Sequence, residues 1–149
     1  MVEVFVKQMQ DEFEMIMVRG LSYFLRFQIK QFNEGIFISQ SKYAKNLVKK
    51  FGLQSACGKR TSAPTHVIMS KDSNGTNVDE SLYRSIIGSL LYLIASRPDI
   101  AFSVGVCARY QSCPKNGHLL SVKRIIKYIN GTNDYGLLYT IDTNNALIG

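Results

Sequence analysis

The longest apolar run of the chain, from Ile86 to Ala95, predicts a helix that is buried within the protein. The run is shorter than the roughly 20 residues that a helix needs to cross a membrane. Apolar residues recur at every fourth position in this region, with two more beside them: Leu82, Ile86, Leu90, Ile94, Ile87 and Leu91. This spacing predicts a helix that is apolar around most of its circumference and packed on several sides. Pro98 cannot continue that helix but suits the first turn of another, so a second helix follows after a tight corner over residues 96–99.

A change to alternating apolar and polar positions predicts an antiparallel β-hairpin over residues 21–40. The alternation from 21 to 29 has the period of two that marks a half-buried strand, and only Phe24 interrupts it. Residues 33–35, Asn-Glu-Gly, supply a turn, and the segment GIFISQ continues as the returning strand. An acidic helix over about residues 2–16 precedes the hairpin and could cover its sheet with the apolar residues of one side, which are Phe5, Met9, Phe13 and Ile16.

Two further segments predict helices with one apolar and one basic face. In residues 41–51 the helical period gathers four lysines on one face, opposite an apolar face, and Gly52 suits the C-cap. A helix over residues 118–130 repeats this design, with three basic residues facing away from the apolar side. The basic residues of the two helices are Lys42, Lys45, Lys49 and Lys50, and Lys123, Arg124 and Lys127.

These elements predict an α+β protein whose parts follow one another along the chain. We expect residues 1–52 to form a helix, a hairpin and a basic helix, and residues 80–132 to form a helical region. Between them, residues 53–79 lose periodicity and gain Ser, Thr, Gly and Asn, which is typical of a connecting loop. Residues 133–149 predict a strand, a polar turn and the beginning of another strand, which we expect to form a short, truncated β-hairpin.

The charge is unevenly distributed, and this adds a candidate function. The 149 residues include 18 Lys and Arg against 11 Asp and Glu, a net charge of +7. No acidic residue occurs between Gly35 and Lys71 or between Ile100 and Asn133. A basic surface confined to part of a chain is typical of proteins that bind phosphates, although lysines that only face solvent are a common alternative.

The cysteines and the N-terminus indicate a cytoplasmic or nuclear protein that is not secreted. Cys57, Cys107 and Cys113 lack the spacing of a zinc site and cannot all form disulfides, so we expect reduced thiols. The N-terminus lacks the long apolar core of a signal peptide. His66 and His118 have no second His or Cys at ligand spacing, so neither predicts a metal site.

Three segments of the chain resemble the reverse transcriptase of copia-type LTR retrotransposons. They are SYFLRFQIKQFNEGIFISQSKYAKNLVKKFG, YRSIIGSLLYLIASRPDIAFSVGVCARYQ and HLLSVKRIIKYINGTNDYGLLY. The likeness covers essentially the whole chain, and the three segments occur in the same order as in the family. It implies that residues 1–52 form the end of the palm, including a hairpin that grips the primer, and that residues 80–132 form a thumb-like helical bundle. Residues 133–149 would then be the truncated start of a ribonuclease H-like region.

The resemblance also implies a parent enzyme that uses Mg²⁺, because its polymerase and ribonuclease H centres hold two metal ions with clustered carboxylates. The two acidic motifs of the family are a Tyr-x-Asp-Asp turn and a Tyr-Ser-Asp-Ala-Asp-Trp-like strand, and neither occurs in this sequence. We therefore expect no catalytic residue, no metal ligand and no cofactor in this chain. Asp99, beside Pro98, is expected to cap a helix start.

The function implied is that of a non-catalytic fragment of a Pol polyprotein that binds nucleic acid. Its expected partners are the backbone of an RNA/DNA or DNA duplex, bound weakly and without sequence preference, and the rest of the polyprotein, with no role for a membrane. Each phosphate that a lysine neutralises steepens the salt dependence of such binding. The expected contact residues are Gln28 and Lys30 on the hairpin, together with Lys42, Lys45, Lys49, Lys50, Lys123, Arg124 and Lys127.

One departure from the family and two other interpretations stay open. Where the family's hairpin has Phe-Leu-Gly, this chain has Phe24, Leu25 and Arg26. The arginine either adds bulk where backbones pack closely or contacts phosphate. The chain could be one exon, or a truncated gene product, of an active RNA-directed DNA polymerase with ribonuclease H. It could also be an independent helical interaction module in which the helix from Leu82 to Ile94 packs against a partner protein.

Overall fold

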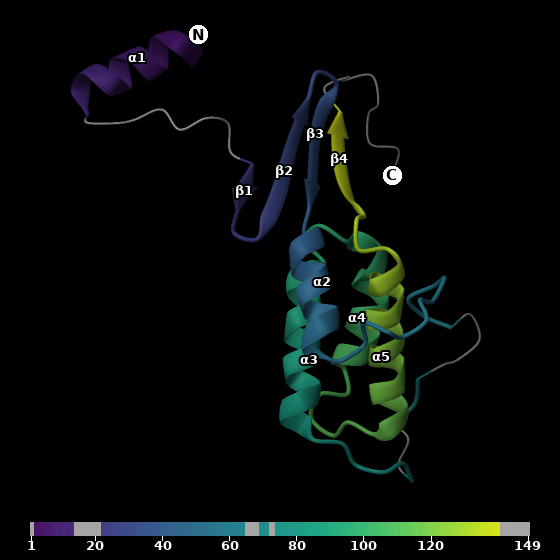
Figure 1. The fold of residues 1–149 in the computed structure, drawn as a ribbon. Coiled ribbons are helices and arrows are strands. Elements are labelled where there is room, and N and C mark those ends of the chain that lie inside the picture. The colour runs from purple at the N-terminus through teal and green to yellow at the C-terminus, as the bar shows by residue number, and fades with distance from the viewer. Residues whose placement is uncertain (1, 14–21, 65–68, 72–73, 141–149) are drawn as a thin grey trace.

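The computed structural model describes residues 2–13, 22–64, 69–71 and 74–140. A four-stranded antiparallel sheet stands at one end of a bundle of four helices (Figure 1). The strands are β1 (Tyr23–Phe24), β2 (Phe27–Phe32), β3 (Gly35–Ser39) and β4 (Gly136–Thr140), in that order across the sheet. The helices are α1 (Val2–Glu12), α2 (Ser41–Lys50), α3 (Glu80–Leu93), α4 (Ala101–Ala108) and α5 (Asn116–Gly131), with the short 3₁₀ helix η1 (Pro98–Ile100) before α4. The predicted α+β class is confirmed.

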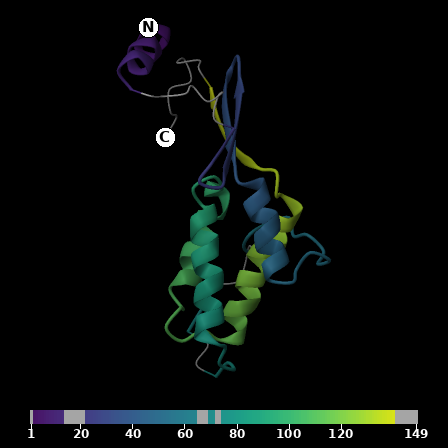
Figure 2. The same ribbon diagram turned by 60° about the vertical axis from the view of Figure 1, so that its left-hand side comes forward.

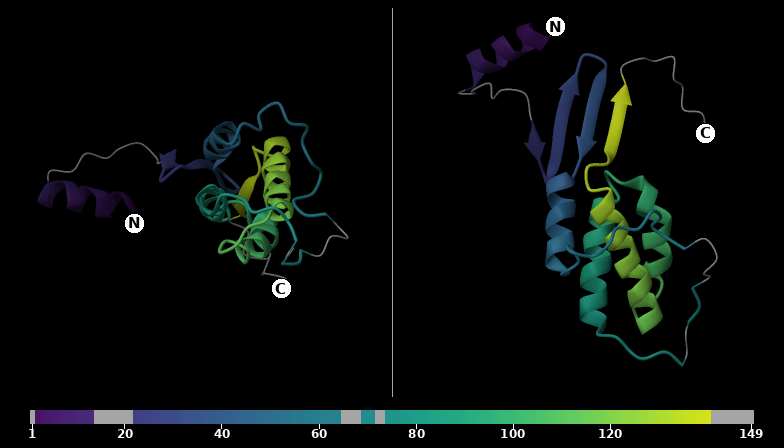
Figure 3. Two further views of the ribbon diagram at one scale, coloured as in Figure 1. Left: turned by 90° about the horizontal axis from the view of Figure 1, so that it is seen from below. Right: turned by 45° about the vertical axis from the view of Figure 1, so that its right-hand side comes forward.

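Helices α2 to α5 surround one apolar core, as the view from below shows (Figure 3, left). The fully buried apolar residues of the bundle are Ala44, Leu47, Val48, Tyr83, Ile86, Ile87, Leu90, Leu93, Ile100, Val104, Cys107, Val122, Ile125, Ile126 and Ile129. Because α2 buries one apolar side, its four lysines face outward, as the helical period predicts. The C-cap of α2 is Phe51, and Gly52 ends the helix one residue later, with φ of 66° and its N–H donating to the carbonyl of Lys49 at 3.0 Å.

The prediction that α3 is packed around most of its circumference is wrong. Leu82 and Leu91 are 44% and 47% exposed, while the five buried residues of this helix lie on the side toward its neighbours in the bundle. An interval of four residues drifts around a helix of 3.6 residues per turn, so such a series does not stay on the buried side. The predicted corner and second helix are confirmed by η1 and α4.

The predicted single strand over residues 21–29 is interrupted by a tight turn. Phe24 pairs with Phe27, and the two residues between them both have positive φ, 46° at Leu25 and 65° at Arg26. This is the backbone of a two-residue hairpin turn whose twist suits antiparallel strands. The hydroxyl of Tyr92 on α3 donates to the carbonyl of Leu25 and so ties the turn to the bundle.

The turn predicted at residues 33–35 is confirmed, because residues 33–34 connect β2 to β3. Strand β3 then runs directly into α2 (Figure 2), with only Gln40 between them. The C-terminal strand β4 was expected to pair with a strand that follows it, but its observed partner is β3, from Gly35 opposite Thr140 to Ser39 opposite Gly136. The rest of the expected C-terminal hairpin lies outside the described residues.

Helix α1 does not cover the sheet, which was the expectation from its amphipathic pattern. It stands apart from both sheet and bundle (Figures 1 and 3), and Phe5 and Phe13 are 60% and 55% exposed. The helix is confirmed as far as Glu12, and the rest of the predicted span lies beyond the described residues.

A buried polar corner joins the sheet to the bundle. Arg97, 2% exposed, donates from Nε and Nη2 to the two carboxylate oxygens of Asp99 at 2.9 and 2.7 Å. Its Nη1 donates to the carbonyl of Thr132 at 2.7 Å, just before the chain enters β4. Ser96 donates to the side-chain oxygen of buried Gln40 at 2.8 Å, just before the chain enters α2. The corner after α3 therefore fixes both places where the chain passes between sheet and bundle.

Candidate nucleic-acid interface

A polar groove of about 500 Å³ lies where one face of the sheet meets the first turn and a half of α2. Strand β2 contributes Gln28 and Lys30 to it, and α2 contributes Lys42 and Lys45. We call it the basic groove. Its other lining residues are Phe37 and Ser39 of β3, Ser41 and Asn46 of α2, and Asp134. Four of the nine residues expected to contact nucleic acid are thus brought together from two elements.

The local geometry of the basic groove follows from strand alternation and from the β3–α2 connection. Gln28 and Lys30 are two residues apart on β2 and therefore share a face of the sheet. Gln28 is paired with Ser39, so it sits where the chain leaves β3 for α2. The backbone N–H of Lys42 donates to Oε1 of Gln28 at 3.0 Å, which satisfies one of the free donors in the first turn of α2.

The electrostatics of the basic groove are positive, with one acidic side chain at its edge. Lys45 Nζ lies 3.5 Å from a carboxylate oxygen of Asp134, and the two side chains are 60% and 79% exposed. An ion pair so exposed contributes little and exchanges readily with other partners. Lys42 Nζ lies 5.9 Å from the centre of the Tyr23 ring, and neither Lys42 nor Lys30 has an acidic partner among the described residues. The groove therefore retains capacity for an anion.

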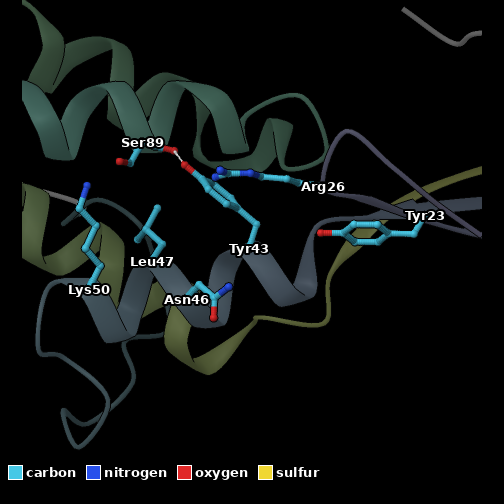
Figure 4. Close-up of a pocket in the computed structure, with 7 residues that line it drawn as sticks. All are labelled: Tyr23, Arg26, Tyr43, Asn46, Leu47, Lys50 and Ser89. Carbon is cyan, nitrogen blue, oxygen red and sulfur yellow. Dashed lines mark hydrogen bonds between the residues drawn. The ribbon is translucent and has the colours of Figure 1, made fainter.

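A second pocket, of about 330 Å³, lies between the β1–β2 turn, α2 and α3 (Figure 4). We call it the turn pocket. Its lining residues are Tyr23, Arg26, Tyr43, Asn46, Leu47, Lys50 and Ser89. Lys50 was predicted to share a face with the other lysines of α2, but it lines this pocket instead, and its Nζ donates to Ser85 Oγ at 3.2 Å. Lys49 is exposed and lines neither cavity.

The basic residues of α5 do not join either cavity. Lys123 is exposed, whereas Arg124 and Lys127 are half-buried. The loop that follows α2 crosses α5 (Figures 1 and 3), and Arg124 Nη2 donates to Thr61 Oγ1 at 2.9 Å. The carbonyl of Lys127 accepts from the N–H of Lys59 at 3.3 Å. Of the three residues expected to contact nucleic acid here, two are thus partly covered by the chain itself.

Apart from Gln28, the sequence did not predict the neutral and acidic residues that line these two cavities. Asn46 lines both cavities. Because it follows Lys42 by one helical turn, the sequence places it on the same side of α2 as that lysine and could have indicated its role. Asp134 reaches the basic groove only through the pairing of β4 with β3, which no local pattern indicates. Asp99 was expected to cap a helix, but its carboxylate accepts instead from Arg97 and from the hydroxyl of Tyr128 at 2.8 Å.

The described part of the chain has no cluster of side chains that could hold the Mg²⁺ ions used by the reverse transcriptases that the sequence resembles. Within those residues, no three His, Cys, Asp or Glu side chains gather closely enough to hold a metal ion. The same residues contain no helix long and apolar enough to cross a membrane.

Comparison with known proteins identifies relatives among transposon polyproteins. The chain is 31% identical over 137 residues to the uncharacterized mitochondrial protein AtMg00810 of Arabidopsis thaliana, a match that covers 92% of this chain and 57% of that protein. It is 32% identical over 117 residues to the retrovirus-related Pol polyprotein from transposon RE2 of the same plant, covering 78% of this chain. It is 35% identical over 104 residues to the corresponding polyprotein from transposon TNT 1-94 of Nicotiana tabacum, covering 65% of this chain.

The matched region is a small part of the polyproteins. It spans 8% of the length of the RE2 polyprotein and 8% of the TNT 1-94 polyprotein. No protein-family model matches the chain. No solved structure matches it either.

Proposed function

This chain belongs to the copia-type family of retrovirus-related transposon Pol polyproteins, of which it matches one segment, and we propose that it binds the template–primer duplex of a reverse transcriptase. In this proposal the sheet acts as part of the palm and the helical bundle as a thumb. The observation that carries the proposal is the basic groove, where Gln28 and Lys30 of the hairpin meet Lys42 and Lys45 of α2.

The side chains of the basic groove suit the backbone of a duplex better than its bases. Lysine ammonium groups are flexible point charges that neutralise phosphates, and such contacts position a protein on a duplex without reading its sequence. The Gln28 amide and the hydroxyl of Ser41 supply further hydrogen-bonding groups beside the lysines. A polymerase has to accept every sequence, so contacts of this kind fit the proposed role.

Binding to a short RNA/DNA duplex, followed by fluorescence anisotropy at rising salt, tests the proposal. The 149-residue chain is expected to bind two unrelated sequences equally well and to lose affinity steeply between about 50 and 200 mM salt. The double variant Lys42→Gln/Lys45→Gln should bind more weakly at low salt. Its plot of log affinity against log salt should be shallower by about 2, because each lysine contributes roughly 0.9 to the slope.

A matched control separates the groove from net charge. Lys7 on α1 and Lys71 in the connecting loop are both exposed and lie outside the groove, so Lys7→Gln/Lys71→Gln removes the same two charges. This variant should retain the affinity and the salt slope of the unmodified chain within about half a unit of slope. Equal losses in both double variants, or no binding by the unmodified chain at low salt, would contradict the proposal.

A second element of the proposal is a surface for the rest of the polyprotein, and it rests on the other face of the sheet. Apolar side chains line an open groove of about 300 Å³ there, and the residues are Phe24, Phe27, Ile29, Ile38, Leu137 and Tyr139, with Ala95 at its end. An exposed apolar sheet face of this kind marks an interface. Since the matched segment is 8% of the RE2 polyprotein, the remainder of such a chain is the partner that we propose.

The apolar face can be tested with a separately expressed upstream segment of the same polyprotein. Ile29 and Ile38 are cross-strand partners on this face and are half-buried, so Ile29→Thr/Ile38→Thr keeps β-branched residues in the strands. The variant should weaken co-elution of the two segments. Unchanged co-elution would show that the partner binds elsewhere.

A further inference from the structure

Arg26 occupies a backbone conformation in which an arginine is unfavourable. Its φ is 65°, in the left-handed region that glycine enters without steric cost, and its neighbour Leu25 has φ of 46°. The hydrogen bond from Tyr92 to the carbonyl of Leu25 holds the turn in place. Strain of this kind, held by surrounding contacts, is found at sites where a side chain must be presented in one direction.

The direction in which Arg26 points is the turn pocket. Its guanidinium carbon lies 5.3 Å from the centre of the Tyr43 ring, and the side chain reaches over that ring toward α3 (Figure 4). Tyr43 is held in turn, because its hydroxyl donates to the carbonyl of Ser89 at 3.1 Å. The guanidinium therefore lies on a fixed aromatic support at one side of the pocket.

The turn pocket holds two cations and no carboxylate. Lys50 lies on the other side of Tyr43 from Arg26 (Figure 4), and none of the seven lining residues is acidic. Lys50 Nζ donates to a neutral hydroxyl, that of Ser85. Within the described residues neither cation has an acidic partner. Two cations beside a concave surface without a counter-ion favour an anionic ligand.

We infer that the turn pocket binds the phosphates of an unpaired nucleic-acid strand that adjoins the duplex. This inference rests on the proposed function, because the duplex itself is placed in the basic groove. Asn46 lines both cavities, so a strand that leaves the groove passes directly into the pocket. A duplex is too wide to enter a cavity of about 330 Å³, whereas a single strand can enter it.

The aromatic residues of the turn pocket support an unpaired strand as the ligand. Tyr23 is 49% exposed and stands at the end of the pocket near the N-terminus of α2 (Figure 4). Exposed aromatic rings stack on unpaired bases of any sequence, and this stacking combines with cationic contacts to the backbone in proteins that bind single strands. A free polyphosphate shares the phosphate chemistry but would make no use of Tyr23.

The test compares a blunt RNA/DNA duplex with the same duplex carrying a short single-stranded extension. The unmodified chain should bind the extended duplex about tenfold more tightly, a gain of the size that one stacked base supplies. Arg26→Gly removes one of the two cations and leaves Tyr23 and Lys50 in place, so it should reduce this preference at least about threefold while leaving affinity for the blunt duplex unchanged. Because glycine relieves the strained position, the variant is expected to fold, and its circular dichroism spectrum and melting temperature verify this.

A conservative variant and a competing polyphosphate complete the experiment. Arg26→Lys keeps the charge and should retain a measurable preference for the extended duplex. Tripolyphosphate added at constant ionic strength should reduce the preference only weakly. Equal affinity of the unmodified chain for both duplexes, a preference that is undiminished in Arg26→Gly, or a preference that tripolyphosphate abolishes would each overturn the inference. Failure of the proposed function is a different result, namely no binding of the blunt duplex.

Discussion

Replacing Asp99 by asparagine should destabilise the protein more than a similar change in any exposed ion pair. The carboxylate compensates the charge of Arg97, which is 2% exposed and lies 5.5 Å and 5.3 Å from the ring centres of Tyr128 and Tyr135. An asparagine of nearly the same shape keeps one hydrogen bond at most to the guanidinium. It also leaves a buried cation without a counter-charge at the corner that joins the sheet to the bundle.

The magnitude follows from the burial of the two partners. Removing one partner of a fully buried ion pair costs about 3–5 kcal/mol. Here the arginine side chain is 2% exposed but the Asp99 side chain is 35% exposed, so water screens part of the interaction. We expect a loss of about 2–3 kcal/mol. In the exposed pair of Arg84 and Glu80, with side chains 55% and 50% exposed, Glu80→Gln should cost only about 0.2–1 kcal/mol.

The pH dependence provides a second, independent prediction. Burial alone would raise the pKa of Asp99, but the hydrogen bonds from Arg97 and Tyr128 and the charge of Arg97 outweigh it and lower the pKa below its usual value. A carboxyl group whose pKa is lowered on folding contributes stability above its unfolded pKa of about 3.9 and loses it as the pH falls through the folded pKa. The difference between the unmodified chain and Asp99→Asn should therefore shrink below about pH 4.

Urea unfolding followed by circular dichroism, at several pH values, measures both effects. The matched variant Glu80→Gln controls for the loss of one negative charge. The reasoning would be refuted if Asp99→Asn cost no more than Glu80→Gln at pH 7. It would also be refuted if the difference between Asp99→Asn and the unmodified chain stayed constant as the pH was lowered.

Three further predictions concern the sheet, the groove and the thiols. A Cβ on Gly35 would collide with the carbonyl of Tyr139, so Gly35→Ala should lower the free energy of unfolding in urea by about 1–3 kcal/mol. Gly88 on α3 has open space around it, so Gly88→Ala should raise that free energy by about 1 kcal/mol. Removing the acidic group from the edge of the basic groove by Asp134→Asn should raise affinity for a blunt RNA/DNA duplex about two- to fivefold in anisotropy titrations, and unchanged affinity would argue against binding there. Burial raises the pKa of the Cys107 thiol to about 11, so a thiol reagent at pH 8 should label the two exposed cysteines rapidly and Cys107 only after unfolding.

The helices of the bundle could be predicted because their signals are local. Apolar periodicity located α2, α3 and α5, Pro98 indicated the helix that follows α3, and Gly52 marked the end of α2 with the positive φ that the structure shows. The exposed face of α2 followed from the same periodicity, whereas the connecting loop partly covers Arg124 and Lys127 on α5. Which part of a helix meets a neighbour is not a local property, and this is why Leu82 and Leu91 were wrongly expected to be buried.

The sheet was predicted less well because two of its features depend on non-local contacts. The turn at Leu25 and Arg26 replaces a continuous strand, and neither residue is one that prefers positive φ. A glycine at position 26, as in the resembling family, would have signalled the turn, so the arginine concealed it. The partner of β4 is β3, about a hundred residues earlier, and only the folded bundle brings the two together.

The positions of the α2 lysines in the folded protein explain why the candidate site could be predicted only in part. At about 100° per residue, Lys45 and Lys50 are about 140° apart around the helix, so one basic arc can face two different neighbours. The hairpin lies beside one end of that arc and makes the basic groove with Lys42 and Lys45, whereas α3 lies beside the other end and makes the turn pocket with Lys50. Periodicity therefore predicts that these lysines are exposed, and tertiary packing decides what each one can bind.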